Sequence, residues 1–137
     1  ICFYSDKEKI IFTGDTLFSL GCGRIFEGTY SQMLISLDKI KNLPKLTNIY
    51  CGHEYTKKNL DFCSQIEFDN RFLEEKRRWV NLRISKKEAT LPVTIEEELN
   101  TNIFLRCDVP SVKKSLGMEN SSRVEIFKKL RDLKDSF

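Results

Sequence analysis

The first part of the chain alternates short apolar runs with polar turns. Residues 1–5 and 10–13 are β-branched and aromatic runs on either side of the charged turn 6–9, and this pattern predicts a β-hairpin. Both runs are too uniformly apolar for an amphipathic helix, so we expect them to lie in a covered sheet. A third strand is expected at residues 46–51. Helical spacing between the second and third strands predicts a βαβ crossover.

The segment between the hairpin and the third strand divides into a loop and a helix. Residues 17–28 are rich in glycine, so we expect an irregular loop with unusual backbone angles. Thr29 and Gln32 then form a capping box, which opens a helix that ends near Asn42 and Pro44. The apolar residues that we expect on its buried face are Met33, Leu34, Leu37 and Ile40.

After the third strand, strand signals disappear and helical spacing takes over. Helices are predicted over residues 56–66 and 70–84, and residues 86–92 form a predicted linker. We assign Phe72 and Trp79, in the second of these helices, to the core in preference to a ligand platform. Two more capping boxes and a helix-starting proline mark three further helices; the residues are Thr94 with Glu97, Pro110, and Ser122 with Glu125.

Composition narrows the class of protein. The chain has 137 residues, of which 40% are apolar, and this suffices for the core of one domain or of two small units. No apolar run approaches the roughly 18 residues of a membrane span, and no signal peptide is visible, so we expect a soluble, cytoplasmic protein. The net charge of +3 is small, and it favours an anionic small ligand over nucleic acid.

The cysteines and the first residue add two further expectations. Five cysteines are widely spaced without a Cys-x-x-Cys pair, which indicates reduced, packed thiols and argues against a disulfide framework or a zinc knuckle. The chain starts at Ile1, inside a strand pattern and without an initiator methionine. We therefore expect it to be part of a longer polypeptide or of a split one.

His53 is the only histidine, and it follows the third predicted strand. Asp15 follows the second strand, and a helical crossover would bring both side chains to the same edge of one sheet. A carboxylate beside an imidazole fits zinc, iron or manganese. The alternatives are a structural histidine and an ordinary Gly-Asp turn.

Two ligands do not make a catalytic metal site. Such a site needs at least three protein ligands and an open position for water, and the chain offers no second histidine. Cys22 and Cys51 are poorly placed substitutes. Either another chain segment completes the site, or the pair does not bind a metal.

Several motifs together are similar to those of one known family. They lie at residues 12–18, 21–24, 26–29, 50–56, 102–106 and 131–137. On these motifs the chain resembles glyoxalase II, the hydroxyacylglutathione hydrolase family of the metallo-β-lactamase fold. Gly-Asp at a strand end is shared by the whole superfamily, whereas Gly-Cys-Gly-Arg, Cys-Gly-His-Glu-Tyr and a basic final helix are more specific.

The resemblance implies an α/β fold: the C-terminal half of a metallo-β-lactamase-type β-sandwich, followed by an α-helical domain. Residues 1–54 are then expected to be part of the catalytic domain, and residues 55–137 a helical glutathione-binding domain. The family's first metal motif, Thr-His-x-His-x-Asp-His, and a histidine expected just before Ile1 are absent. The chain is therefore expected to need an N-terminal half, in the same or a separate chain.

The resemblance also implies a reaction, the hydrolysis of S-D-lactoylglutathione to glutathione and D-lactate in methylglyoxal detoxification. Asp15 would bridge two divalent metal ions, with zinc as the first choice and iron or manganese as alternatives, and His53 would bind one of them. The ions would activate water for attack on the thioester carbonyl. Because most of the metal ligands are missing, the chain alone is expected to be inactive.

Glutathione-binding residues follow from the same resemblance; they are Arg24, Phe26, Tyr55, Arg131 and Lys134. Phe26 stands where the family often has tyrosine, which removes a hydroxyl from the site. Arg131 and Lys134 are three positions apart, so they share one side of the last helix and could hold a carboxylate. An ordinary solvated helix face is the alternative for this pair.

Two other functions stay open. Another metallo-β-lactamase-fold hydrolase, such as a relative of persulfide dioxygenases, would share the Gly-Asp turn, although the helical extension and the basic last helix count against it. A non-catalytic remnant that at most binds glutathione is the second alternative. A sheet without its partner strands would also leave apolar surface exposed.

Overall fold

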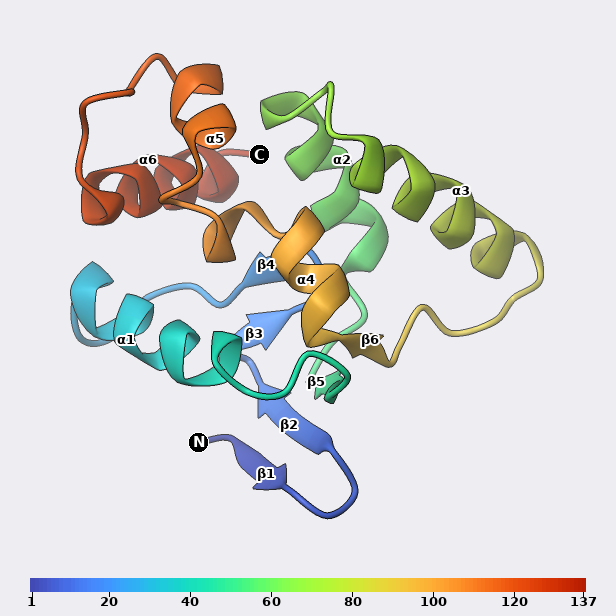
Figure 1. Cartoon of the computed structure of the whole chain (residues 1–137). Coiled ribbons are helices and arrows are strands. Elements are labelled where there is room, and N and C mark those ends of the chain that lie inside the picture. The colour runs from blue at the N-terminus through green and yellow to red at the C-terminus, as the bar shows by residue number, and fades with distance from the viewer.

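Six strands form two small sheets (Figure 1). The strands are β1 (Phe3–Ser5), β2 (Ile10–Gly14), β3 (Leu17–Phe18), β4 (Gly21–Cys22), β5 (Asn48–Cys51) and β6 (Val93–Thr94). The computed structural model describes residues 1–137. The larger sheet has the order β1-β2-β5-β6, in which β2 and β5 run parallel and the outer pairs are antiparallel, and the smaller sheet pairs β3 with β4.

Helices make up most of the rest of the chain. They are α1 (Tyr30–Lys41), α2 (Thr56–Ile66), α3 (Arg71–Ser85), α4 (Ile95–Thr101), the 3₁₀ helix η1 (Ile103–Leu105), α5 (Pro110–Ser115) and α6 (Arg123–Asp135). The three predicted capping boxes, at Thr29, Thr94 and Ser122, are confirmed, as is Pro110 at the first position of α5. None of these helices combines the length and the apolar character that a membrane span requires. The predicted α/β class is confirmed.

The predicted hairpin and βαβ crossover are also confirmed. β1 pairs antiparallel with β2, and β5 lies parallel to β2 after the crossover through α1. Leu34, Leu37 and Ile40 form the buried face of α1. Ile11 and Ile49, which are partners in the β2–β5 register, are buried in the same core.

The segment after β2 is more ordered than the sequence predicts. Residues 17–22 form the β3–β4 hairpin, in which Leu17 and Leu20 are fully buried, so the expectation of an irregular loop is wrong for this part and holds only for residues 23–28. Leu20 has a φ of +61°, a left-handed conformation that is uncommon for a residue with a side chain. Groups from distant segments hold this turn, and the local sequence does not reveal them.

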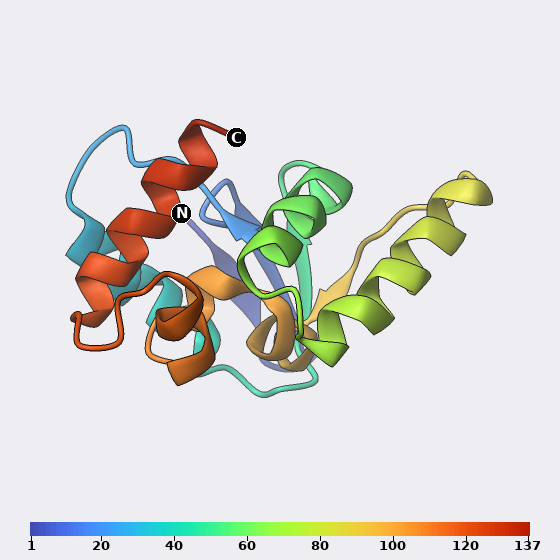
Figure 2. The ribbon, with the colours of Figure 1, turned by 90° about the horizontal axis from the view of Figure 1, so that it is seen from above.

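The sequence does not predict β6, which has only two residues. It pairs antiparallel with β5, so the expectation that strands end before the helical segment is wrong. A two-residue strand has no periodicity to detect, and its partner strand imposes its conformation. The linker at residues 86–92 is confirmed, and Figure 2 shows that α3 and this linker extend away from the rest of the molecule.

The buried face of α3 differs from the expected one. Leu73, Lys76 and Val80 are buried, whereas Phe72 is exposed and Trp79 only partly buried, so the expected core stripe is wrong for Phe72. Lys76 can be buried because its ammonium group lies 4.2 Å from the Trp79 ring centroid and pairs with a glutamate of α4. A lysine thus occupies a core position on this helix.

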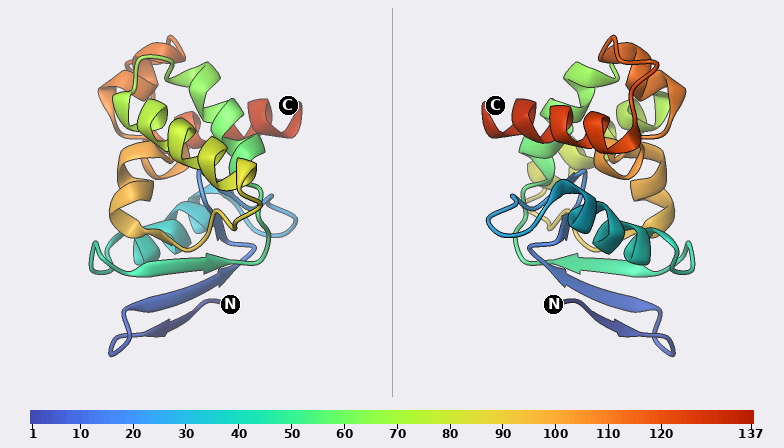
Figure 3. Two further views of the ribbon diagram at one scale, coloured as in Figure 1. Left: turned by 90° about the vertical axis from the view of Figure 1, so that its right-hand side faces the viewer. Right: turned by 90° about the vertical axis from the view of Figure 1, so that its left-hand side faces the viewer.

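Helices cover one face of the larger sheet and leave the other face bare (Figure 3). The bare face carries an aromatic row, Phe3, Phe12 and Tyr50, which are neighbours across β1, β2 and β5. Phe3 is 69% exposed and Phe12 is 55% exposed. The expectation of a covered sheet is therefore wrong for this face, because nothing in the chain packs on it.

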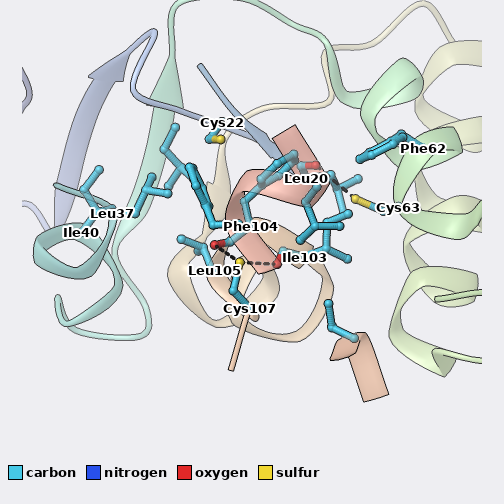
Figure 4. Packing of buried hydrophobic residues seen from close by; sticks show 14 of the residues in the cluster. Leu20, Cys22, Leu37, Ile40, Phe62, Cys63, Ile103, Phe104, Leu105 and Cys107 are labelled. Carbon is cyan, nitrogen blue, oxygen red and sulfur yellow. Dashed lines mark hydrogen bonds between the residues drawn. The ribbon is translucent and has the colours of Figure 1, made fainter. Parts of the chain in front are cut away.

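One cluster of 23 buried residues connects the sheet to the helices. The ring of Phe104 lies 6.3 Å from that of Phe62 and 5.9 Å from that of Phe127, so it joins α2 to α6. Figure 4 shows Leu20 and Cys22 near Phe104 in this core. The core is continuous from the first strands to the last helix, and the division into residues 1–54 and 55–137 stays a prediction.

A buried glutamate ties the helices to the β3–β4 hairpin. Glu98 of α4 accepts hydrogen bonds from the backbone N–H of Leu20 at 2.8 Å, the Ser19 hydroxyl at 3.2 Å and the Asn102 amide at 2.8 Å. Asn102 also donates to the carbonyl oxygen of Gly21 at 3.1 Å. Burial raises the pKa of Glu98 to about 7. The left-handed turn therefore depends on polar groups from a helix 78 residues further along the chain.

The burial of Glu98 predicts that the protein is more stable near pH 5 than near pH 8. Its folded-state pKa of about 7 lies above the ordinary value of 4.5, so the folded state binds the proton more tightly. The free energy of unfolding should therefore fall, by on the order of 2–3 kcal/mol, as the pH rises from about 5 to about 7. Urea denaturation of the wild type and of Glu98→Gln across this range measures the effect. A variant that keeps the full pH dependence of the wild type would contradict this prediction.

Candidate functional site

A pocket of about 580 Å³ opens where β2 and β5 end, beside α2 and α6. All seven residues that the sequence singles out line it, although they come from separate segments: Asp15, Arg24, Phe26, His53, Tyr55, Arg131 and Lys134. The fold thus brings these side chains together around one space. Their individual roles stay predictions.

Asp15 and His53 lie side by side in this pocket. His53 Nε2 is 3.6 Å from Asp15 Oδ1. The strand ends approach closely, since the Gly52 N–H donates to the carbonyl oxygen of Gly14 at 2.8 Å. A Cβ on Gly52 would lie 2.6 Å from Asp15 Oδ1, so a side chain there would displace the carboxylate. The structure therefore places the carboxylate beside the imidazole, as expected from the crossover.

This pair supplies part of a metal-binding donor set. Both side chains are more than half exposed, and an oxygen and a nitrogen donor together suit a divalent metal ion. No group of three or more potential ligand side chains is present, whereas a catalytic metal needs at least three. Cys51 donates its thiol to the carbonyl oxygen of His53 at 3.3 Å, and burial raises the pKa of Cys22 to about 11. The residues of this chain thus fit two positions of a metal site and do not complete it.

Aromatic rings surround the imidazole. Tyr55 stacks on His53 with ring centroids 5.0 Å apart and planes tilted by 15°. Phe18 contacts Tyr55 edge-on at 5.2 Å and lies 6.2 Å from His53. Phe26 is exposed where it lines the pocket. Tyr55 and Phe18 restrict the orientation of the imidazole, and all three rings give the pocket an apolar wall.

Arg131 is buried, so the alternative of an ordinary solvated helix face is wrong for this residue. Its Nη1 donates to the carbonyl oxygen of Cys22 at 2.9 Å, and its guanidinium lies 5.3 Å from the ring centroid of Phe104. Its Nη2 donates to Asp135. Its Nε is buried without a hydrogen-bond acceptor. The guanidinium is therefore held in place with one donor left unpaired.

Lys134 contributes a second unpaired donor. Its Nζ is buried without a hydrogen-bond acceptor and lies 5.0 Å and 4.8 Å from the ring centroids of Phe62 and Phe137. Burial lowers the pKa of Lys134 to about 8. Lys58 adds another positive charge to the pocket lining. The pocket thus combines a carboxylate–imidazole pair with a wall of cations.

Arg24 lies on the loop between β4 and α1, which passes beside α6 (Figure 2). Its Nε is 3.4 Å from Asp135 Oδ1. The preceding Gly23 packs directly against the turn at Asp15, since a Cβ on Gly23 would lie 2.0 Å from the backbone oxygen of Asp15. Real Cβ atoms do not approach that closely. The Gly-Cys-Gly-Arg motif therefore lets the loop carry Arg24 past the Asp15 turn.

The pocket is also lined by three residues that sequence reasoning did not single out: Phe18, Lys58 and Asn59. Lys58 and Asn59 follow Tyr55 by three and four positions, so helical spacing could have placed them on the same side of α2. The Asn59 amide also donates to the carbonyl oxygen of Ser19 at 2.9 Å and supports the β3–β4 hairpin. Phe18 carries no such signal, because its position depends on that hairpin.

The fold and the pocket define an α/β protein module in which a pocket with a cationic and aromatic lining adjoins Asp15 and His53. Residues 54–137 match the family described as hydroxyacylglutathione hydrolase C-terminus. The chain belongs to this family. The resemblance found in the sequence motifs is therefore confirmed.

Relatives extend this similarity over the whole chain. Across all 137 residues it is 54% identical to the hydroxyacylglutathione hydrolase of Pelagibacter ubique (strain HTCC1062), and it covers 52% of that protein. It is 46% identical to the hydroxyacylglutathione hydrolase of Bartonella tribocorum (strain CIP 105476 / IBS 506) and 45% identical to that of Chelativorans sp. (strain BNC1), covering 54% of each. The chain thus spans about half the length of the curated relatives that it matches.

The close packing of Gly23 predicts that Gly23→Ala is strongly destabilising. The new methyl group would overlap backbone atoms of Asp15, which cannot rotate away, so we expect a loss of about 2 kcal/mol or more. Gly117→Ala is the matched control, because Gly117 has a φ of +65° and open space around it, and should cost only about 1 kcal/mol. Urea denaturation measures both values. Equal losses in the two variants would contradict the close approach at Gly23.

Proposed function

We propose that this chain is the part of a hydroxyacylglutathione hydrolase that binds glutathione and supplies two metal ligands. The reaction is the hydrolysis of S-D-lactoylglutathione to glutathione and D-lactate, in methylglyoxal detoxification. The observation that carries the proposal is one pocket in which the pair Asp15 and His53 adjoins the cations Arg131 and Lys134. The names of the relatives agree with it.

The cationic wall supports an anionic ligand with a carboxylate. Arg131 Nε and Lys134 Nζ are both buried, and neither has an acceptor in the protein. A buried donor without a partner costs about 1–3 kcal/mol, and a ligand carboxylate that reaches these donors after a small rotation of either side chain would remove this cost. Glutathione carries two carboxylates, and one of them could accept from both donors. Arg24 and Lys58 add positive charge that attracts the same ligand.

The aromatic wall would contact the cysteine part of glutathione, which carries the thiol. Tyr55, Phe18 and Phe26 line the pocket and offer apolar surface to the cysteine part of the tripeptide. The Tyr55 ring, stacked on His53, places this surface directly beside the metal-type donors. Phe26 has no hydroxyl, so it can contribute only apolar contact at its position.

Asp15 and His53 would hold metal, and the proposed site contains two divalent ions, with zinc as the first choice and iron or manganese as alternatives. Metal ions in such a site lower the pKa of water and polarise a carbonyl oxygen. Asp15 and His53 approach to 3.6 Å, which allows both to contribute to one site. The other ligands would come from the N-terminal half, since the relatives are about twice as long as this chain.

The bare face of the sheet also supports the proposal that an N-terminal half completes the enzyme. The exposed row of Phe3, Phe12 and Tyr50 is an apolar surface of the kind that a second sheet covers in a β-sandwich. We therefore include in the proposal that the N-terminal half packs on this row and completes a metallo-β-lactamase-type sandwich. Residues 1–54 would belong to that catalytic domain, residues 55–137 would form the glutathione-binding domain, and the enzyme would act in the cytoplasm.

Glutathione binding should depend on the charge of Lys134. Lys134→Met keeps most of the length of the side chain and removes its charge, and losing a charge-assisted hydrogen bond should weaken binding about 10-fold or more. The same change removes a buried, unpaired ammonium group, so the thermal midpoint should stay equal or rise. Lys128→Met, on the exposed side of α6, is the control and should change neither quantity. Isothermal titration calorimetry measures the affinity of both variants for glutathione, and thermal denaturation measures their stability. Unchanged affinity in Lys134→Met would count against the proposed site.

Hydrolysis should require both halves of the enzyme. The chain alone should not turn over S-D-lactoylglutathione in the presence of zinc, whereas a fusion to the N-terminal half of the Pelagibacter relative should do so. In that fusion, Asp15→Asn and His53→Ala should lower kcat by at least about 100-fold, since each removes a metal-type donor, and Lys128→Ala should not. Turnover by the chain alone would refute the need for a second half. A folded fusion that binds zinc and glutathione without turnover would favour the non-catalytic alternative.

A further inference from the structure

Asp135, the last residue of α6, joins two arginines of the pocket. Its Oδ1 accepts a hydrogen bond from Arg131 Nη2 and lies 3.4 Å from Arg24 Nε. Arg24 belongs to the loop after β4, and the other two residues belong to the final helix. One carboxylate therefore connects two segments of the pocket wall that are far apart in the sequence.

The two arginines depend on Asp135 to different degrees. Arg131 is buried and pairs with Asp135, but the carbonyl oxygen of Cys22 and the ring of Phe104 also hold its guanidinium. The side chain of Arg24 is 63% exposed, and Asp135 is its only charged partner. Asp135 therefore mainly determines where the Arg24 guanidinium lies.

The position of Asp135 runs against the local preferences of a helix. A negative charge in the last turn lies at the negative end of the helix dipole. An acidic residue four positions after a basic one is also the less favourable order for such a pair. Residues that break local rules are expected at functional sites. The local preferences of a helix therefore do not account for an aspartate here.

We propose that Asp135 is a positioning residue that holds Arg24 beside Arg131. The two guanidinium groups then bind one carboxylate of glutathione together. This inference rests on the proposed function, because it takes the ligand of the pocket to be glutathione. Asp135 does not bind the ligand itself, since two carboxylates repel each other. It acts by ordering an exposed, flexible side chain in advance, so that less conformational freedom is lost on binding.

Glutathione titrations of the 137-residue chain by isothermal titration calorimetry test this role. Asp135→Asn keeps the shape of the side chain and removes its charge, so Kd should rise about 3- to 10-fold. The urea midpoint should fall, because the buried Arg131 loses its only charged partner, and it should fall equally in an Arg24→Gln background. Asp135→Glu should restore most of the affinity. Asp132→Asn is the matched control, because Asp132 lies in the same helix turn and accepts from the Tyr30 hydroxyl at 3.3 Å; its Kd should change less than about 2-fold.

A double-mutant cycle isolates the effect on Arg24. In an Arg24→Gln background, Asp135→Asn should change Kd less than about 2-fold, because the side chain that it positions is gone. An effect of the same size in both backgrounds overturns the proposal. Unchanged or tighter binding by Asp135→Asn also overturns it.

The same titrations separate this inference from the function on which it rests. A wild-type chain that does not bind glutathione overturns the proposed function and the role of Asp135 with it. A wild-type chain that binds glutathione, with equal binding by Asp135→Asn, overturns only the role of Asp135.

Discussion

Parallel pairing of β2 with β5 is the constraint on which the pocket depends. Two parallel strands end at the same edge of a sheet, and here the Gly52 N–H donates to the carbonyl oxygen of Gly14 at that edge. The turns that follow carry Asp15 and His53. The distance between these two side chains is therefore determined mainly by the backbone pairing, and side-chain rotation adjusts it. α2 begins directly after the second turn, which places Tyr55 on the imidazole. Strand pairing thus positions donors and aromatic wall together.

Elements with local signals could be predicted from the sequence, and elements imposed by distant partners could not. The capping boxes at Thr29, Thr94 and Ser122 involve residues three positions apart, so a short window contains the whole interaction. The β3–β4 hairpin depends on Glu98, and β6 depends on pairing with β5. No window around Leu20 contains the carboxylate that holds its left-handed turn. Local patterns therefore predicted helix starts and the crossover, and missed the small strands.

The candidate site follows the same division. The meeting of Asp15 with His53 could be predicted, because two strand ends and one crossover determine it. A shared site for Arg24 and Arg131 was implied by the resemblance alone, since helical spacing could not distinguish a buried arginine from a solvated one. Arg131 can be buried because its guanidinium donates to the carbonyl oxygen of Cys22 and lies over the ring of Phe104. Both partners lie far from it in the sequence.

The hydrogen bond from Arg131 to Cys22 spans 109 residues, and this separation has a consequence for biosynthesis. Contacts of long sequence separation form late in folding, and a chain leaves the ribosome with its N-terminal segments first. The edge that carries Asp15 and His53 can pair as soon as β5 has emerged. The cationic wall cannot form until the last turn of α6 is free of the exit tunnel. A product that stops short of Arg131 would therefore keep Asp15 and His53 and lose the cationic wall, so this wall is the last part of the pocket that the nascent chain can form.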